Sequence, residues 1–134
     1  MSVKRQAEQG WAYLRLGIGC SFRGDYKRAV ELLCQAADIF EALKVREGVC
    51  RAYQAMGTVH FRRRNHAPAM EMYEKSLAIA RDIDDTAGMC SSHLNIGDVL
   101  ASQRQYQKAI EQYEAALDLA RDLDDRIKLC ACYT

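Results

Sequence analysis

The chain has 134 residues, a formal net charge of +1, 49% hydrophobic residues and 28% charged residues. This length corresponds to about one domain, and the composition is that of a folded globular protein rather than a disordered one. Because the charges nearly cancel, no overall field would attract nucleic acid or a membrane surface. No apolar run approaches the roughly 18 residues of a membrane-spanning helix, and none follows the basic pair near the N-terminus as in a secretory signal. The default compartment is therefore the cytosol or the nucleus, and we expect a cytoplasmic protein.

Residues from about 10 to 49 are predicted to form a first pair of helices. The first helix contains "YLRLGIGC" from Tyr13, the second contains "DYKRAVELLCQAADIF" from Asp25, and "RGD" at Arg23 separates them. Asp25 is a favourable N-cap, because its side-chain oxygen can accept a free backbone N–H of the first turn.

Residues from about 50 to 89 repeat this arrangement. "YQAMGTVH" from Tyr53 and "NHAPAMEMYEKSLAIA" from Asn65 are separated by "RRRN" at Arg62. Asn65 is a second N-cap, and Pro68 lies in the first turn, where its missing N–H costs little. Apolar residues at i, i+3, i+7 and i+10 predict one buried helical face, formed by Met70, Tyr73, Leu77 and Ala80.

A third copy is expected from about 90 to 129, with "HLNIGDVL" from His93 and "QYQKAIEQYEAALDLA" from Gln105 on either side of "SQRQ" at Ser102. The paired aspartates Asp84-Asp85 and Asp124-Asp125 mark the joints between copies and favour the start of the next helix electrostatically. Residues 126–134, "RIKLCACYT", match the start of a fourth copy and stop before its glycine. We therefore expect a fragment of a longer array, with an open C-terminal end.

The copies are spaced by forty residues without an insertion, and "YEKSLAIARDIDD" from Tyr73 nearly equals "YEAALDLARDLDD" from Tyr113. Glycine recurs in the middle of each first helix, although it costs about 1 kcal/mol relative to Ala there. This recurrence predicts that another helix crosses closely, with the alanines twelve residues later as its contact. The coinciding positions are Gly17, Gly57 and Gly97, followed by Ala29, Ala69 and Ala109.

The pattern resembles the tetratricopeptide repeat over residues from about 10 to 123. The resemblance rests on the apolar-Gly pairs, on Tyr near the turn between the helices (Tyr26, Tyr106) and on Ala in the second helix (Ala36, Ala116). The family's usual proline near the end of the second helix is absent. The period of forty and "NIGD" at Asn95 are similar to the Leu-Gly-Asn-type polarity adaptors and to the receptor-clustering scaffold rapsyn.

This resemblance implies an all-α fold, a right-handed α-solenoid of antiparallel helix pairs with three repeats and the start of a fourth helix pair. It also implies a non-enzymatic protein that holds other proteins. Cytoskeletal, cortical or G-protein-linked signalling partners would suit such an adaptor, and a place at the cytoskeleton or cell cortex would follow.

The six cysteines favour packing over metal or redox chemistry. Cys50, Cys90 and Cys130 fall at one phase of the repeat, which indicates the same packing role in each copy, and the sequence has no C-x-x-C pair. It also has no nucleophile elbow, no phosphate-binding glycine loop and no metal-ligand spacing. We therefore expect no cofactor, no metal and no enzymatic activity.

In a stack of this kind the first helices line a concave inner face. Their residues outside the apolar stripe are the candidates for contact with a partner peptide or helix, and the alternative is an ordinary solvated helix face. Amide side chains could bond a peptide backbone, and arginine could hold carboxylates in a planar fork. The predicted groove residues are Arg15, Arg51, Gln54, Thr58, Arg62, Asn95 and Asp98, with Trp11, Leu14, Ile18, Phe61, Ser91 and Leu94 at related phases.

Charge is uneven along the stack. Residues 42–81 have an excess of basic side chains and residues 82–121 an excess of acidic ones, which favours a partner segment of mixed or acidic charge. The turn "FRRRNH" at Phe61 is interpreted as a solvated turn or as a contact with an acidic protein. Nucleic-acid binding is not expected, because it would need a longer basic stripe with stacking aromatic residues.

The sequence thus predicts a protein-interaction scaffold that binds a partner in its concave groove. Two alternatives stay open. One is a structural segment that self-associates through its C-terminal end, and the other is a regulatory module of a longer signalling protein.

Overall fold

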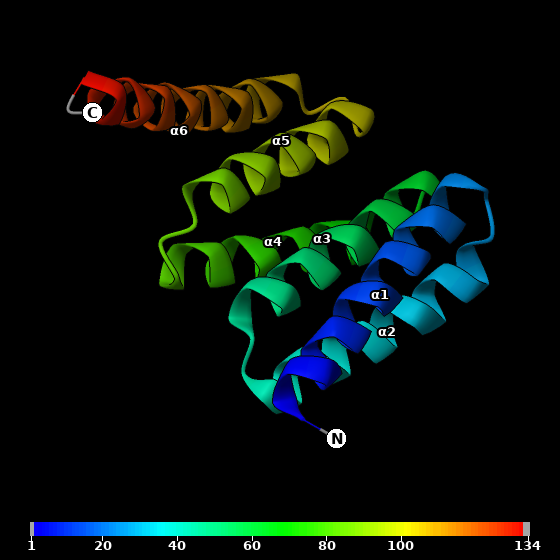
Figure 1. The fold of residues 1–134 in the computed structure, drawn as a ribbon. Helices are drawn as coiled ribbons and strands as arrows, with labels where there is room; N and C mark the ends of the chain where they lie inside the picture. Colours follow the sequence, from blue (N-terminus) through cyan, green and yellow to red (C-terminus); the bar gives the residue numbers. More distant parts are fainter. Residues whose placement is uncertain (1, 133–134) are drawn as a thin grey trace.

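The computed structural model describes residues 2–132, with the side chains of residues 125 and 127–132 left out. Within this range the chain forms only α-helices joined by short turns, and they succeed one another from one end of a stack to the other (Figure 1). They are α1 (Val3–Phe22), α2 (Tyr26–Leu43), α3 (Arg46–Arg62), α4 (His66–Asp82), α5 (Thr86–Ser102) and α6 (Tyr106–Cys132). The predicted all-α solenoid is confirmed.

The way in which the helices contact one another curves the stack. Each helix packs on the next along the chain, and α3 additionally contacts both α1 and α5. Within the described residues, no comparable contact joins α2 to α4 or α4 to α6. Because the first helices of the pairs are close together and the second helices are spread apart, α1, α3 and α5 line the concave side.

The turns inside the helix pairs recur at the period of the sequence. Gly24, Arg64 and Arg104 are forty residues apart, and each has a left-handed backbone, with φ of 85°, 62° and 62°. The helices end at Phe22, Arg62 and Ser102, which confirms the three predicted breaks.

The joints between pairs also use a left-handed residue, Lys44 and then Asp84, but the third predicted joint is wrong. Helix α6 continues through Asp124 and residue 125 to Cys132, so the described chain has no separate fourth helix. The two existing joints are followed by Gly48 and Gly88. A Cβ atom at Gly48 would collide with the ring of Phe40, and a Cβ atom at Gly88 would collide with the carboxylate of Asp85. The third copy carries Lys128 at that position in place of glycine.

The observed helices begin slightly before the predicted repeat boundaries. Helix α3 starts at Arg46 and α5 at Thr86, four residues ahead of the boundaries at 50 and 90, and α1 already begins at Val3. The helix pairs thus span 3–43 and 46–82, followed by a third pair from residue 86.

The predicted capping bonds are wrong although the capping positions are correct. Asp25 and Asn65 precede α2 and α4, but neither side chain accepts a backbone hydrogen bond. For Asn65 the reason is Pro68, which occupies the third helical position and has no N–H to donate. Nothing in the structure explains Asp25. At α5, by contrast, Asp85 accepts the Gly88 N–H at 3.0 Å.

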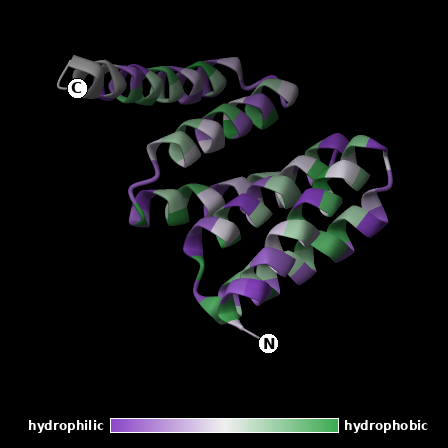
Figure 2. Ribbon diagram, in the orientation of Figure 1, coloured by the Kyte–Doolittle hydropathy of each residue, from purple (hydrophilic) through white to green (hydrophobic). Residues whose placement is uncertain are grey.

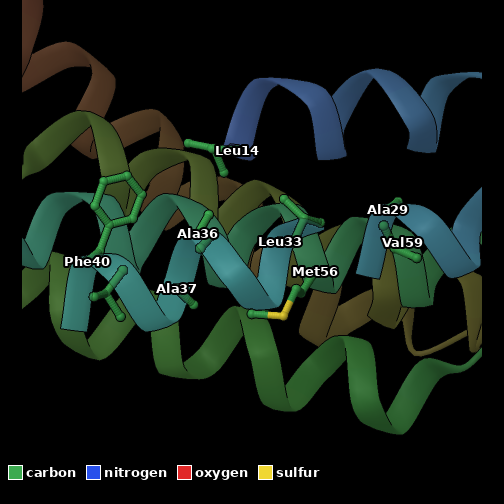
Figure 3. Packing of buried hydrophobic residues seen from close by; sticks show 10 residues of the cluster. Leu14, Ala29, Leu33, Ala36, Ala37, Phe40, Met56 and Val59 are labelled. Atoms are coloured by element: carbon green, nitrogen blue, oxygen red, sulfur yellow. The ribbon is translucent and has the colours of Figure 1, made fainter. Parts of the chain in front are cut away.

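The core lies between successive helices, and each helix presents both hydrophobic and hydrophilic residues (Figure 2). Figure 3 shows the larger cluster, where side chains of α1, α2 and α3 interdigitate around Leu33 and Phe40, both fully buried. The predicted α4 stripe is confirmed, since Tyr73, Leu77 and Ala80 are buried and Met70 packs against the second cluster. The larger cluster comprises Leu14, Ala29, Leu33, Ala36, Ala37, Phe40, Val49, Ala52, Met56 and Val59.

The central glycines do mark close crossings, and the predicted alanine is one contact at Gly17, where a Cβ atom would lie 3.3 Å from the Ala29 carbonyl oxygen; the nearest atoms at all three glycines belong to a larger side chain. A Cβ atom at Gly17, Gly57 or Gly97 would lie 2.7, 2.6 or 2.5 Å from a large side chain of the following helix. These side chains are Leu33, Tyr73 and Tyr113. The leucine or tyrosine side chain fills the space that each glycine leaves.

Candidate functional site

A cavity of about 380 Å³ lies on the concave side, where α1, α3 and α5 come together. We call it the groove pocket. Helix α3 forms its centre, and α1 and α5 form its two sides. It is lined by Leu14, Ile18, Ser21 and Phe22 of α1, by Arg51, Gln54, Ala55, Thr58 and Arg62 of α3, and by Ser91 and Asn95 of α5.

Most of the predicted groove residues meet in this pocket. Of the seven, those that line it are Arg51, Gln54, Thr58, Arg62 and Asn95. Arg15 is exposed on α1 and does not line it. Asp98 is also outside the lining, and its carboxylate accepts a hydrogen bond from the Tyr113 hydroxyl at 2.7 Å. This bond, assisted by burial, raises the pKa of Tyr113 to about 12.

Two of the polar residues in the pocket are occupied by internal hydrogen bonds. Gln54 donates from Nε2 to the Gly88 carbonyl at 3.2 Å and to the Ser92 hydroxyl at 3.1 Å, so it holds α3 to α5. Thr58 shares a 2.9 Å hydrogen bond with the Tyr73 hydroxyl. The predicted bidentate contact of Gln54 with a peptide backbone would therefore break existing bonds, and we assign both residues to shaping the pocket.

The two arginines differ in their surroundings. Arg51 forms a 3.3 Å ion pair with Glu47, but both side chains are more than half exposed, so the pair contributes at most about 1 kcal/mol. Arg62 Nη1 lies 3.5 Å from the Ser21 carbonyl oxygen, and its guanidinium carbon is 4.6 Å from the centre of the Phe22 ring. Within the described chain no carboxylate pairs with Arg62, so its charge is available to an anionic ligand.

The wall formed by α1 is apolar and partly open to solvent. Phe22 is 69% exposed and Ile18 is 37% exposed, whereas Leu14 is a core residue that reaches only the floor of the pocket. Trp11 packs on Phe40, with ring centroids 4.7 Å apart, and is not part of the pocket.

Sequence reasoning missed Ser21, Phe22 and Ala55. Phe22 lies four positions beyond Ile18 on the same face, so extending the helical phase by one turn would have identified it. Helix α1 continues to Phe22, because the "RGD" break begins only at Arg23.

The cysteines serve as packing groups at matching positions. The Cys50 thiol donates to the Ser76 carbonyl at 3.3 Å, and the Cys90 thiol donates to the Ala116 carbonyl at 3.4 Å, as expected for one phase of the repeat. Burial, as the main cause, raises the pKa of Cys50 to about 11, which keeps this thiol protonated. The predicted counterpart Cys130 lies outside the described side chains. Over the described residues, no group of His, Cys, Asp or Glu could hold a metal ion, and no helix is long and apolar enough to cross a membrane.

Comparison with known families agrees with the helix pairs. A family model described as tetratricopeptide repeat matches residues 8–82, and a second with the same description matches residues 90–123. The chain belongs to the tetratricopeptide repeat family. Membership supports a general role as a protein-interaction scaffold, and this fold is typically a non-enzymatic interaction module.

Similar proteins show how widely this tetratricopeptide arrangement occurs. A Tonsoku-like protein of Danio rerio is 32% identical over 83 residues, which are 60% of this chain and 6% of that protein. Aspartyl phosphate phosphatase F of Bacillus subtilis superimposes with a TM-score of 0.85 at 16% identity, covering 89% of this chain and 31% of that one. The tetratricopeptide domain of Arabidopsis FLU gives 0.79 at 16% identity, covering 87% and 98%.

The two structural likenesses concern the fold alone, because their sequence identity is low. The chain spans a small part of the Tonsoku-like protein and about a third of the phosphatase.

Proposed function

We propose that the groove pocket binds an extended or helical segment of a partner protein that carries both apolar and acidic side chains. The observation that carries the proposal is the composition of the lining. Exposed Phe22 and Ile18 stand beside Arg51 and Arg62, and the lining contains no acidic residue.

The apolar wall would supply most of the affinity and the arginines would select the charge. Apolar area removed from water stabilises a complex by roughly 25 cal/mol per Å², whatever the partner's sequence. A carboxylate beside Arg62 gains a charge-assisted bond, whereas a lysine or arginine there would be repelled. Asn95 remains free to bond the backbone of the bound segment, since no hydrogen bond of its side chain occurs within the described chain.

In this proposal the protein is a cytoplasmic, non-enzymatic adaptor. Its partner segment comes from a cytoskeletal, cortical or signalling protein, in keeping with the sequence resemblance to the polarity adaptors and rapsyn. The chain spans only a small share of the Tonsoku-like protein. This supports the alternative proposal, in which the repeats are a regulatory module of a longer protein.

A peptide-library screen with two variants tests the groove. Arg51→Gln/Asn95→Ala alters two side chains of the pocket, and Arg15→Gln alters an exposed arginine of α1 outside it. Both should keep the helical circular dichroism of the wild type. We expect acidic-apolar peptides that bind the wild type and Arg15→Gln, and that bind the double variant at least tenfold more weakly. Equal binding by all three proteins would show that the groove pocket is not the site.

A second candidate function, self-association, is favoured by the outer face of α6. Tyr106, Ile110 and Leu117 form one stripe at helical spacing and are 60%, 46% and 49% exposed. Leu77 on α4 and Ala37 on α2 are the equivalents of Leu117 in the earlier repeats. Leu77 is 8% exposed because α5 covers it, and Ala37 is 6% exposed because α3 covers it. The exposed stripe of α6 thus corresponds to the face that α2 and α4 each bury against the next helix. We propose that a second copy of the chain covers this stripe.

Light scattering over a range of protein concentrations tests this candidate. The wild type should change from monomer to dimer as concentration rises, Leu117→Glu should stay monomeric, and the exposed control Lys108→Glu should behave as the wild type. A wild type that stays monomeric at every concentration would rule out self-association and leave α6 open for a helix of another protein.

A further inference from the structure

A second cavity, of about 410 Å³, lies beside the groove pocket at the turn between α3 and α4. We call it the turn pocket. Its lining residues are Phe61, Arg62, Arg64, His66 and Ser102. They belong to the end of α3, the turn, the start of α4 and the end of α5. Helices of two successive pairs therefore build one hollow.

The lining is rich in hydrogen-bond donors and has no acidic member. Arg62 and Arg64 each carry a guanidinium, and neither forms an ion pair within the described part of the chain. Ser102 adds a hydroxyl. The Nδ1 atom of His66 is buried and has no hydrogen-bond partner among the described residues, so the accessible donors of the lining are the two guanidinium groups and the Ser102 hydroxyl.

The backbone adds positive potential at the same place. Helix α4 begins at His66, so the positive end of its dipole lies at this pocket. Asn65 does not cap this helix end, and Pro68 leaves it with one N–H fewer. The first free N–H groups of α4 thus stand beside two arginines, an arrangement that favours anions.

We propose that the turn pocket binds a phosphorylated serine or threonine of the partner segment. This inference rests on the proposed function, because Arg62 lines both pockets and one bound segment would lie across the two. A phosphate carries about −1.5 to −2 charge and three acceptor oxygens, and arginine binds it in a bidentate manner. Two guanidinium groups and the Ser102 hydroxyl match the larger charge and the three oxygens of a phosphate better than the single charge of Asp or Glu.

The same arginines would attract an RNA phosphate, but the surroundings favour a peptide. The two rings of the turn pocket, Phe61 and His66, pack edge-on to each other, with ring centroids 6.1 Å apart. A base would find no stacking platform of successive aromatic residues there.

Two libraries of acidic-apolar peptides test the proposal, one with a fixed phosphoserine and one with aspartate at that position. The test variant is Arg64→Asn/His66→Gln, whose side chains line only the turn pocket. Asparagine tolerates the left-handed backbone of position 64, so the turn is retained. Arg51→Gln/Asn95→Ala serves as the groove control.

We expect the wild type to prefer phosphoserine over aspartate by about tenfold or more, the factor that accompanies loss of a charge-assisted hydrogen bond. The turn variant should lose this preference and still bind the aspartate peptides. Arg64→Lys, which keeps the charge, should retain part of the preference. The groove variant should bind both libraries weakly.

Amide NMR spectra with added inorganic phosphate, at constant ionic strength, separate the two proposals. Shifts at His66 and Ala67 that the turn variant abolishes would support the anion site even if no peptide bound the groove. Peptides that bind the groove equally well with phosphoserine or aspartate would overturn the phosphate site and leave the groove intact. Competition by a single-stranded RNA as strong as that by the phosphopeptides would overturn the choice of partner.

Discussion

The crossing of α3 and α4 at Gly57 leads to a stability prediction with an internal control. A methyl group at position 57 would lie 2.6 Å from Cε1 of Tyr73, whereas ordinary contacts begin near 3.4 Å. The Tyr73 ring would have to move by roughly 0.8 Å, and it is only 2% exposed. In contrast, a methyl group at Gly19 in α1 would meet nothing within 4 Å.

The magnitudes follow from competing effects. Overpacking a closed site costs about 1–3 kcal/mol, and displacement of the ring would weaken the Thr58–Tyr73 hydrogen bond by about 1 kcal/mol more. Replacement of a helical glycine by alanine returns about 1 kcal/mol. Gly57→Ala should therefore lower the free energy of unfolding by about 1–3 kcal/mol, and Gly19→Ala should raise it by about 0.5–1 kcal/mol.

Urea denaturation followed by circular dichroism at the helix band measures both changes. The dependence of the unfolding free energy on urea should stay the same, so that a shifted midpoint reports stability. If Gly57→Ala is as stable as Gly19→Ala, helix propensity alone governs these positions and the close crossing has no energetic weight.

Two further predictions concern hydrogen bonds between helices. Asp98→Asn should lower the pKa of Tyr113 from about 12 toward 10, seen as earlier tyrosinate absorbance in an alkaline titration. Because the folded-state pKa is raised, the contribution of Tyr113 to stability is complete below about pH 10 and is lost as pH rises through about 12. Ser76→Ala and Ser92→Ala should each cost about 0.5–1.5 kcal/mol in urea unfolding, since each removes the buried 2.9 Å bond between the two hydroxyls. The remaining hydroxyl keeps a second bond, from Gln54 to Ser92 or from Ser76 to the Tyr73 carbonyl. The double substitution should cost less than their sum, and an additive result would contradict the coupling.

The sequence predicts the helix pairs well because the repeat samples the same local physics three times. The breaks at Arg23, Arg62 and Ser102 are confirmed since each needs a turn with one left-handed residue, and polar or glycine residues recur there. The concave grouping of Arg51, Gln54, Thr58, Arg62 and Asn95 was also predictable, because helical phase decides which side chains face the inside of the curve.

The features that could not be predicted from the sequence depend on contacts between the repeats. The internal bonds of Gln54 become visible only when α5 is placed against α3. The aspartate pair at Asp124 resembles the pair at Asp84, yet α6 continues past it to Cys132. Local patterns at each aspartate pair look alike, and packing beyond them decides whether a joint forms.

The comparison between copies also indicates where binding specificity can reside. Some core positions keep their residue type in all three copies, as the central glycines and Ala29, Ala69 and Ala109 do. The concave positions differ: Phe22, Arg62 and Ser102 occupy one phase and present an aromatic ring, a guanidinium and a hydroxyl in succession. Such a series has a direction, so a segment bound as proposed would lose its match if it moved by one repeat or reversed. If every copy carried the same concave residues, a bound segment would fit equally well at each repeat. The unlike residues at these few positions would favour one placement of the segment along the groove.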